Sequence, residues 1–355
     1  MSAAPHPDAS FLPEYPERVS RQIFLYLQRG LYWSRAGRAF LFGTGAAGAI
    51  IWEYHSVAPP DEARWIEPSN RVDTGRFERQ IAFLARRRNV VSMDELVDAI
   101  QRDKKLPAGS VVLTFDDGYR DNYTYVASAL AAYDLPATLY LPTGLVTRQE
   151  SPWADRIYTA FKYRRRDTFE HPDVAGSPFD LRTNAKAAYG AIASALLDAS
   201  RATRDDILAA LDEQLDPEVT APCLTLDWAT LRKMQAEFPA FQLGVHSVNH
   251  IDLTAHGEAT AAEEIDGCVE VYERELGAAP RHFAYPYDRH DAMTHAIVST
   301  RTLASAVCNG PDVLIDGKSD PFALPRLAAP DSMSLYRFWS SGAYPGLPRA
   351  LFGRA

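Results

Sequence analysis

Cysteine is scarce in this sequence of 355 residues, which contains only Cys223, Cys268 and Cys308. These three residues are odd in number and far apart, so they predict neither a disulfide framework nor a close-spaced zinc knuckle. A chain of this length can bury about three quarters of its unfolded surface, so it does not need disulfides for stability. Its cysteine content is therefore typical of a protein from a reducing compartment.

Long apolar runs are also lacking. The most apolar segment, residues 39–52, is too short and too rich in glycine to span a bilayer. The first eight residues have neither the basic region nor the apolar core of a secretory signal. We therefore expect a soluble, cytoplasmic protein.

Positive charge is in deficit. The 37 Lys and Arg residues are outnumbered by 46 Asp and Glu residues, which gives a formal net charge of −9. A general nucleic-acid binder needs a basic surface to neutralise phosphates, so we expect no nucleic-acid partner. The 46% hydrophobic and 23% charged content is otherwise that of an ordinary globular protein.

Residues 1–45 are predicted to form a helical N-terminal extension. Basic side chains alternate there with aromatic and aliphatic ones: Arg18, Arg21, Arg29, Arg35 and Arg38 with Phe24, Leu25, Leu27, Leu31, Tyr32 and Trp33. A basic amphipathic helix can lie on an anionic membrane surface, so peripheral membrane contact is one interpretation. The other, which is the more frequent case, is that the aromatic side chains pack on the protein's own domain.

From residue 49 onward, strand-like and helix-like segments alternate. Strands are predicted at residues 49–57, 90–91, 111–115, 137–141, 241–245, 282–285 and 303–307. Between them, helices are expected to start at Thr74 and at the Ser92 capping box, and to cover residues 121–133, 227–238 and 259–276. Repeated β-α units favour a parallel α/β barrel or an open doubly wound sheet.

The domain organisation follows from where this alternation lapses. Residues of about 150–222 are polar and helical, and we interpret them as a helical insertion within one domain at 46–330. Residues 331–355 are predicted to be a C-terminal tail, aromatic and rich in Gly and Pro. The sequence leaves the oligomeric state open.

Two carboxylates follow the apolar run at 111–113, in the motif formed by residues 114–118. Asp116 and Asp117 are thus placed at the carboxyl end of a strand, where α/β proteins bind their ligands. Adjacent carboxylates repel each other unless a positive charge, most often a metal ion, lies beside them. The simpler interpretation is an Asp-Gly turn that begins a helix, with Gly118 at positive φ.

Two histidines follow another predicted strand, at 241–245. His246 and His250 are four residues apart, which would place them on one face of a helical turn, within reach of a single ion. Ser247 stands where zinc proteases have their catalytic Glu, so a general base would have to come from elsewhere, and the Asp pair is a candidate. The alternative is two surface histidines in a loop.

Together these motifs resemble the polysaccharide deacetylase, or NodB-homology, family of metal-dependent carbohydrate esterases. Thr-Phe-Asp-Asp-Gly at 114–118 is followed by His-Ser-x-x-His at 246–250 and by Phe-Ala-Tyr-Pro-Tyr at 283–287. Tyr-His-x-Val at 54–57 resembles the strand that opens one branch of the family. The resemblance covers residues of about 50–330 and implies an α/β fold, a deformed (β/α)7-type barrel.

The resemblance also implies roles for the motif residues. Asp117, His246 and His250 would be the ligands of one divalent metal ion, with zinc as the default and cobalt, manganese or iron as alternatives. Asp116 would be the general base that accepts a proton from the metal-bound water. The backbone N–H of Tyr287 would help to hold the oxyanion.

The sequence departs from the family pattern in three places. Ala284 replaces an Arg that orients the base, as it does in the Tyr-His branch, and Asp288 replaces a Gly, which alters the loop or adds a carboxylate. The late Leu-x-His, whose His protonates the leaving amine, is absent, and residues 324–326 (Leu-Pro-Arg) stand in the comparable place. His55 is the best candidate for the proton donor. Three other histidines are weaker candidates: His282, His290 and His295.

Trp153 opens the insertion and resembles a Trp-rich segment of the same branch. It could stack on a sugar ring or anchor the insertion as a core residue. The expected function is removal of an N-acetyl group from an N-acetylated sugar in an oligosaccharide, polysaccharide or lipid-linked glycan. The alternatives are a C–N hydrolase of a small non-sugar amide and a catalytically inactive carbohydrate-binding or scaffold protein.

Overall fold

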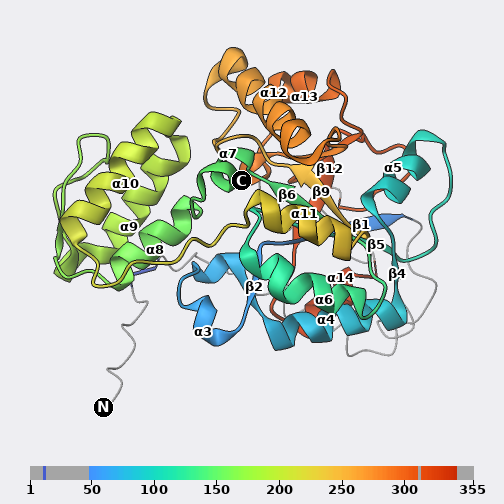
Figure 1. The fold of residues 1–355 in the computed structure, drawn as a ribbon, viewed down its shortest axis with the longest axis horizontal. Helices are drawn as coiled ribbons and strands as arrows, with labels where there is room; N and C mark the ends of the chain where they lie inside the picture. Colours follow the sequence, from blue (N-terminus) through green and yellow to red (C-terminus); the bar gives the residue numbers. More distant parts are fainter. Residues whose placement is uncertain (1–10, 13–47, 311–312, 342–355) are drawn as a thin grey trace, which may run out of the picture.

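Seven parallel strands close into a barrel at the centre of the fold (Figure 1). The computed structural model describes residues 11–12, 48–310 and 313–341. Around the barrel the order is β1-β5-β6-β9-β10-β11-β12, and the pairing of β12 with β1 closes the ring. The strands are β1 (Ala49–Tyr54), β5 (Ser110–Phe115), β6 (Ala137–Leu141), β9 (Phe241–Val245), β10 (His282–Ala284), β11 (Ser305–Cys308) and β12 (Leu324–Ala328). The (β/α)7-type barrel predicted from the sequence is therefore confirmed.

The barrel is deformed at β5. A short extra strand, β4 (Asn89–Val90), pairs with the first two residues of β5, whereas β6 pairs with its last two. The edge of β5 is thus shared between two neighbours. This local splaying leaves β4 outside the closed ring.

Alternate side chains of the barrel strands belong to two different apolar clusters. In β1, Trp52 and Tyr54 are in the large cluster that includes the surrounding helices, whereas Ala49 and Ile51 are in a smaller one shared with the other strands. Successive side chains of a strand point to opposite faces, so the second pair faces the barrel interior. By the same alternation Glu53, two residues after Ile51, also faces the barrel interior.

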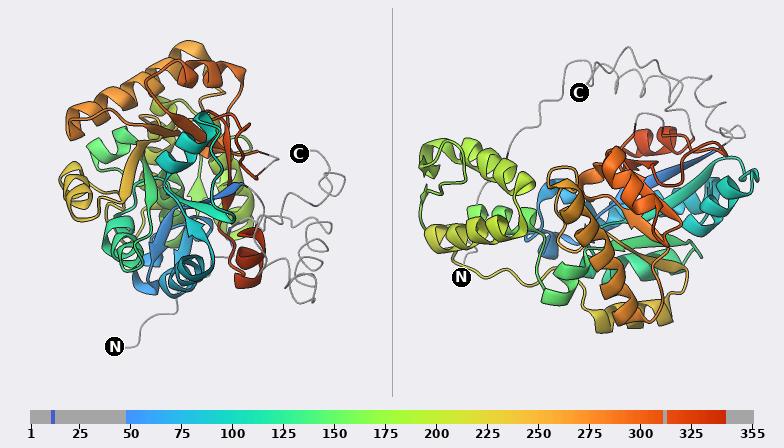
Figure 2. Two further views of the ribbon diagram at one scale, coloured as in Figure 1. Left: turned by 90° about the vertical axis from the view of Figure 1, so that its right-hand side faces the viewer. Right: turned by 90° about the horizontal axis from the view of Figure 1, so that it is seen from above.

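Helices cover the outside of the barrel (Figures 1 and 2). They are α4 (Thr74–Arg87), α5 (Met93–Gln101), the π-helical η2 (Asn122–Ala127), α6 (Ser128–Ala131), α11 (Trp228–Glu237), α12 (Gly257–Leu276) and α13 (Ala292–Ser299). The capping box at Ser92 is present, and Gly277 ends α12 with a left-handed φ of 72°. The cap predicted at Thr74 is wrong by one residue, because it is the carboxylate of Asp73 that accepts the N–H of Arg76.

An insertion projects from one side of the barrel between β6 and β9 (Figures 1 and 2). After α7 (Thr143–Arg148), it comprises α8 (Trp153–Lys162), β7 (Thr168–Phe169), β8 (Phe179–Asp180), α9 (Leu181–Asp198) and α10 (Arg201–Leu215). It has an apolar core of its own, which Phe11 joins, with its ring centroid 5.6 Å from that of Phe161. The insertion is therefore packed internally as well as against the barrel.

Shorter elements complete the described chain. They are β2 (Ser56–Ala58), α3 (Pro60–Ala63), η1 (Pro68–Asn70), β3 (Arg71–Asp73), η3 (Pro286–Asp288) and α14 (Met333–Trp339). Helix α14 covers the outer side of β1, where the rings of Trp52 and Tyr336 stack with centroids 4.7 Å apart. The start of the predicted C-terminal tail thus packs on the barrel.

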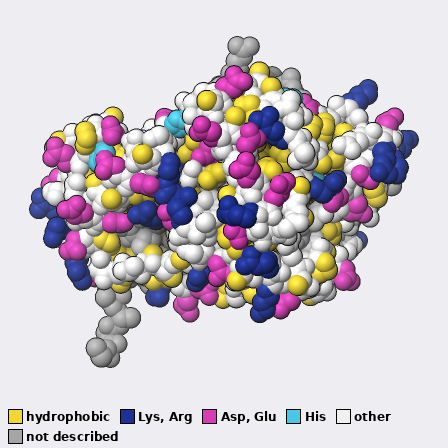
Figure 3. All heavy atoms as spheres, turned by 45° about the horizontal axis from the view of Figure 1, so that its top comes forward, with side chains coloured by type: hydrophobic (Ala, Val, Ile, Leu, Met, Phe, Trp, Pro, Cys, Tyr) yellow, Lys and Arg dark blue, Asp and Glu magenta, His cyan; other side chains and the backbone are white. Residues whose placement is uncertain are grey.

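The predicted N-terminal helix lies outside the described residues, apart from Phe11 and Leu12, and so does the tail after residue 341. Within the described part of the chain, none of the helices is both long and apolar enough to cross a membrane. On the face shown in Figure 3, acidic and basic side chains are interspersed rather than separated by sign.

Candidate active site

A cavity of about 420 Å³ lies at the carboxyl ends of the barrel strands, between the barrel and the insertion. The barrel contributes the polar side of its lining, and α9 of the insertion contributes part of the opposite wall. Seven of the candidate residues singled out from the sequence line this cavity: His55, Asp116, Asp117, Trp153, His246, His250 and Tyr287. The barrel therefore brings together residues that are as much as 232 positions apart, His55 and Tyr287.

The two aspartates are separated by the end of β5. The backbone N–H of Asp116 still donates to the carbonyl of Tyr54 at 2.9 Å, so this residue continues the strand and its side chain enters the barrel. Asp117 then takes a left-handed φ of 68° and Gly118 one of 64°. The chain turns sharply here, and the two carboxyl groups have different neighbours.

The loop after β9 brings both histidines to Asp117. His250 Nε2 lies 3.1 Å from His246 Nε2 and 3.3 Å from Asp117 Oδ1, and His246 Nε2 lies 4.0 Å from the same oxygen. The prediction that the pair lies on a helical turn is wrong, because Ser247 and His250 have left-handed φ values of 60° and 51° in an irregular loop. The loop reverses direction and so makes the imidazoles converge.

The Asp117–His246–His250 group fits a single divalent ion. Ligand atoms about 2.0–2.2 Å from one ion, at near-tetrahedral angles, lie roughly 3.3–3.6 Å apart. The three separations observed bracket this range. His246 Nδ1 lies 2.7 Å from the carbonyl of Ala284, to which it donates, and this leaves the Nε2 lone pair to face the other ligands.

The protonation of these residues also suits a cation. The pKa of His250 is held well below its usual value by burial and by the nearby His246, so its imidazole is neutral and can be a ligand. Burial raises the pKa of Asp117, with partial compensation from His55 and His246. A buried carboxylate in this state would be stabilised by a divalent ion.

A second group of potential ligands, Glu53, His55 and Asp116, lies next to the first. The guanidinium of Arg326 already occupies this place, with Nη2 at 2.7 Å from Asp116 Oδ2 and 3.7 Å from Glu53 Oε1. A divalent ion here would be close to a buried cation, which is electrostatically unfavourable. The residues around Arg326 therefore do not fit a metal.

A third group, in the insertion, consists of His171, Asp173 and Asp206. His171 Nδ1 accepts the backbone N–H of Asp173 at 3.2 Å, so the proton of the neutral ring is on Nε2, which faces Asp206 at 3.3 Å. A protonated nitrogen cannot bind a metal. This arrangement is a hydrogen-bonded histidine rather than a metal site.

Arg326 is the residue of this site whose role the sequence did not reveal. It lies on β12, is 3% exposed, and holds Asp116 with two parallel hydrogen bonds of 2.8 and 2.7 Å. Its Nη2 also donates to Asp288 Oδ1 at 2.5 Å. Arg326 thus supplies from another strand the guanidinium missing at Ala284, and Asp288 adds a carboxylate where the family has Gly. The missing Arg was itself a signal that another cation must hold Asp116.

This network fixes the charge state of Asp116. Burial acts to raise the pKa of its carboxyl group, but Arg326, followed by His246, outweighs burial and holds the pKa well below its usual range. The two hydrogen bonds also fix the plane of the carboxylate. Asp116 is therefore ionised and oriented at neutral pH.

His55 lies at the break between β1 and β2, beside Glu53. Its Nε2 is 3.8 Å from Glu53 Oε1. Burial acts to lower the pKa of His55, but the carboxylates of Glu53, Asp117 and Asp116 outweigh it and raise this pKa. Burial, with the charge of Asp288, raises the pKa of Glu53 itself to about 8. His55 therefore keeps its proton to a higher pH than an ordinary histidine does.

The three weaker histidine candidates lie away from the cavity. His282 is buried at the start of β10, at the opposite end of the strand. His290 stacks on Tyr285 with ring centroids 5.3 Å apart, and His295 Nε2 lies 2.7 Å from an oxygen of Asp320. Of the four histidines considered for proton donation, His55 is the one that lines the cavity.

Trp153 and Tyr287 form a bridge between the insertion and the barrel. Trp153 Nε1 donates to the hydroxyl of Tyr287 at 2.7 Å, and that hydroxyl lies 3.0 Å from the carbonyl of His250, to which it donates. The ring of Tyr287 packs edge-on against the imidazole of His250, with centroids 4.6 Å apart. Trp153 also packs against the apolar core of the insertion, as one of the two predictions for it stated, and it lines the cavity.

Known proteins resemble this chain in sequence or in fold. The sequence model of the polysaccharide deacetylase family matches residues 103–304, which is more than half of the chain. His55, which follows β1, and Arg326 of β12 both lie outside the matched residues. A comparison with curated proteins gave no match.

Solved structures share the fold at low sequence identity. IcaB from Ammonifex degensii is 18% identical, with a TM-score of 0.55 over 84% of this chain and 98% of that chain. The deacetylase PplD of Streptococcus pyogenes, in complex with acetate, is 17% identical, with a TM-score of 0.54 over 84% and 99%. A de-N-acetylase from Aggregatibacter actinomycetemcomitans is 14% identical, with a TM-score of 0.51 over 82% and 99%.

These findings agree with the motifs, the barrel and the cavity. The family match includes three of the motifs read from the sequence, at 114–118, 246–250 and 283–287. The structural matches extend over most of the chain and support the barrel fold. The chain therefore belongs to the polysaccharide deacetylase family of hydrolases.

Proposed function

We propose that this protein is a metal-dependent N-deacetylase that hydrolyses the acetamide of an N-acetylated sugar. The substrate would be an oligosaccharide, a polysaccharide or a lipid-linked glycan. The observation that carries the proposal is the composition of one cavity. It contains a ligand set, Asp117, His246 and His250, beside the carboxylate of Asp116, which Arg326 holds, and the imidazole of His55.

Asp117, His246 and His250 would hold the metal ion, and zinc suits this mixed nitrogen and oxygen set, as cobalt, manganese or iron also would. When bound, such an ion polarises the acetyl carbonyl and lowers the pKa of water. The backbone N–H of Tyr287, on the same cavity wall, would donate to the oxygen that becomes negatively charged.

Asp116 and His55 would carry the protons. The carboxylate of Asp116, held by Arg326, accepts a proton from the attacking water. The protonated imidazole of His55 donates a proton to the leaving nitrogen as the C–N bond breaks. The products are acetate and a sugar with a free amine.

The test is release of acetate, together with a new primary amine, from purified full-length protein. The panel should contain N-acetylated oligosaccharides, nucleotide- and lipid-linked N-acetyl sugars and small non-sugar amides, each with and without a chelator. We expect activity on at least one N-acetyl sugar that is lost with chelator and restored by a divalent metal. Turnover of the small non-sugar amides alone would contradict a sugar substrate and support the alternative function, a C–N hydrolase of small non-sugar amides. Absence of turnover on every member would contradict the proposal.

A further inference from the structure

Arg204 is a buried arginine of the insertion that reaches into the metal-ligand loop. It lies on α10, and 4% of its surface is exposed. Its Nη1 donates to the carbonyls of Asn249 at 3.0 Å and His250 at 2.9 Å. Its Nη2 donates to the hydroxyl of Tyr287 at 3.3 Å, and both Nε and Nη2 donate to the carbonyl of Leu196. The five N–H donors of the guanidinium are therefore all engaged.

The acceptors of Arg204 belong to three separate elements. Asn249 and His250 are in the loop after β9, Tyr287 is in η3 after β10, and Leu196 is in the last turn of α9. The insertion has its own apolar core, distinct from the barrel cores. One side chain thus ties the insertion to the backbone of a ligand residue and to the tyrosine packed on its ring.

The same loop is held on its other side by a carboxylate. Glu264 of α12 accepts the backbone N–H groups of Val248 at 3.0 Å and Asn249 at 2.7 Å. A cation from the insertion therefore binds the loop's carbonyls, and an anion from the barrel binds its N–H groups. A left-handed φ is energetically unfavourable for a residue other than glycine and persists only when the surrounding structure holds it. His250 has such a φ.

We infer that Arg204 is a positioning residue that fixes His250 for metal binding and makes the insertion a working part of the active site. This inference rests on the proposed function, because it assumes that a metal binds at Asp117, His246 and His250. A buried guanidinium whose hydrogen bonds go to carbonyl and hydroxyl oxygens is costly to maintain. Lysine has three donors on a point charge and cannot reproduce the planar fork, so Arg204→Lys would leave buried carbonyls unpaired.

The experiment compares zinc affinity in full-length wild type, Arg204→Lys and Arg156→Lys, measured by competition with a chromophoric chelator. Arg156 is a matched control, because its ion pair with Asp212, at 2.8 Å, lies inside the insertion. Loss of a group that orients a metal ligand typically weakens binding about 10- to 100-fold. We expect this loss in Arg204→Lys and wild-type affinity in Arg156→Lys.

A second readout does not involve the metal. Hydrogen exchange of the metal-free proteins should show faster exchange at residues 246–250 in Arg204→Lys than in wild type or Arg156→Lys. Exchange elsewhere in the barrel should stay close to the control values. Arg204→Gln, which keeps two N–H donors, provides a second variant if the lysine variant does not fold.

The outcomes separate this inference from the proposed function. If wild type binds no zinc, and Asp117→Asn behaves identically, the proposed function fails. If wild type binds zinc and Arg204→Lys binds it equally tightly with unchanged exchange, the positioning role is overturned while the proposed function stands. Failure of both Arg204 variants to fold would also overturn it, since Arg204 would then be required for folding and not for positioning.

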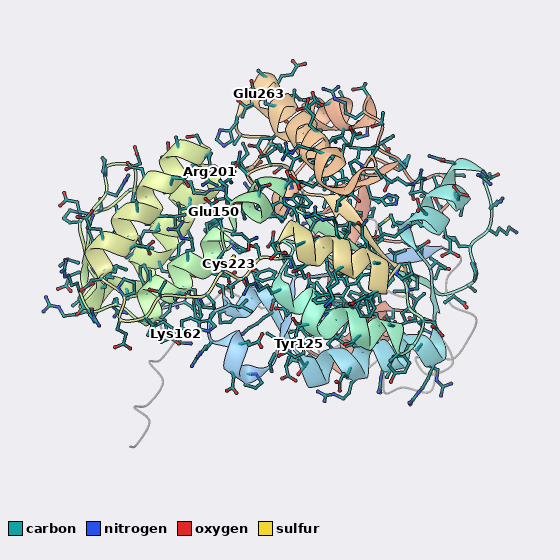
Figure 4. All side chains as sticks on the ribbon, in the orientation of Figure 1. Tyr125, Glu150, Lys162, Arg201, Cys223 and Glu263 are labelled. Atoms are coloured by element: carbon teal, nitrogen blue, oxygen red, sulfur yellow. The ribbon has the colours of Figure 1, made fainter. Side chains whose placement is uncertain are left out.

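A second arginine of α10, Arg201, makes a contact that we expect to be structural only. Arg201 pairs with Glu150 at the junction of insertion and barrel, with two hydrogen bonds of 2.7 and 2.8 Å (Figure 4). It is half-buried, and its ion pairs are with Glu150 and Asp205 rather than with the loop of the ligand residues. We expect Arg201→Lys to leave zinc affinity unchanged, which further isolates the effect to Arg204.

Discussion

Asp116 and Asp117 are adjacent in the chain, yet their carboxyl groups have opposite electrostatic surroundings. Arg326 pairs with Asp116 and lowers its pKa, whereas burial raises the pKa of Asp117, whose nearest side-chain partners are imidazoles. The reversal of φ between the two residues separates their neighbours. The charge of Asp116 is therefore balanced by Arg326 of the protein, whereas a bound cation would balance that of Asp117.

The two aspartates should respond differently to substitution. Asp116→Asn should keep about one metal ion per chain but lower kcat by about 10²- to 10⁴-fold, because a general base contributes about that much. Asp117→Ala and His250→Ala should lose most of the metal. Elemental analysis and acetate release check both statements. Unchanged turnover in Asp116→Asn would show that Asp116 is not the general base. Full metal occupancy in Asp117→Ala and His250→Ala would contradict their assignment as metal ligands.

Arg326 should be essential for both stability and turnover. Arg326→Met leaves the buried carboxylate of Asp116 and the partly exposed one of Asp288 without their cation, and breaking a buried pair costs about 3–5 kcal/mol. Urea denaturation and kcat measure the two effects. Arg301→Met is the control, because its partner Asp266 is 45% exposed and a surface pair contributes about 0–1 kcal/mol. Equal stabilities of the two variants would contradict the role given to Arg326.

The pH dependence tests His55. Its pKa is raised, so the imidazole loses its proton at a higher pH than an ordinary histidine does. As the proton donor, it should therefore give kcat/KM an alkaline limb. Glu53→Gln removes the first of the groups that raise this pKa, so the limb should move to lower pH. A limb that stays in place in Glu53→Gln, or normal activity in His55→Ala, would exclude His55.

The strands that could be predicted are those with mainly apolar sequences. The bounds predicted for residues 137–141 and 241–245 are the observed ones, because parallel strands covered on both faces are mainly apolar. Strand β12 was not predicted, because Pro325 and Arg326 interrupt its pattern. The role of Arg326 was missed for the same reason, since a buried charge becomes recognisable only when its partners are known.

Helix α8 joins the barrel through Asp155, and this junction should weaken as pH rises. Asp155 is buried and accepts hydrogen bonds of 2.7 Å from the N–H of Glu67 and the hydroxyl of Tyr119. Burial raises its pKa to about 8, although both hydrogen bonds act to lower it. The folded protein thus holds a proton that the unfolded chain, with a pKa of about 3.9, has released, so stability falls between about pH 4 and pH 8.

Asp155→Asn should remove this part of the pH dependence. Its carboxamide has no proton to lose, so the unfolding temperature of the variant should fall less from pH 5 to pH 8 than that of wild type. A difference of about 1 kcal/mol corresponds to about 2–4 °C in a domain of some 150–250 residues. Calorimetry at both pH values measures the effect, and parallel curves for the two proteins would contradict the assignment.

The cavity as a whole could not be predicted from the sequence. The motif residues of the barrel were found because each follows a strand, and parallel strands place their carboxyl ends together. The contacts of Trp153 with Tyr287 and of Arg204 with His250 join residues of the insertion to distant loops. No local pattern encodes such contacts, because they depend on how the insertion docks on the barrel.

The insertion should therefore control which substrates enter. Ala193 and Leu197 are one helical turn apart on α9 and line the same cavity as the candidate site residues of the barrel. Ala193→Trp should fill part of the roughly 420 Å³ and raise KM for N-acetyl sugars by about tenfold or more, equivalent to about 1.4 kcal/mol of binding. Metal content should not change, because the ligands belong to the barrel. Ala187→Trp, at an exposed position of the same helix, is the control and should leave KM unchanged. An equal KM in both variants would show that the substrate binds without contacting α9.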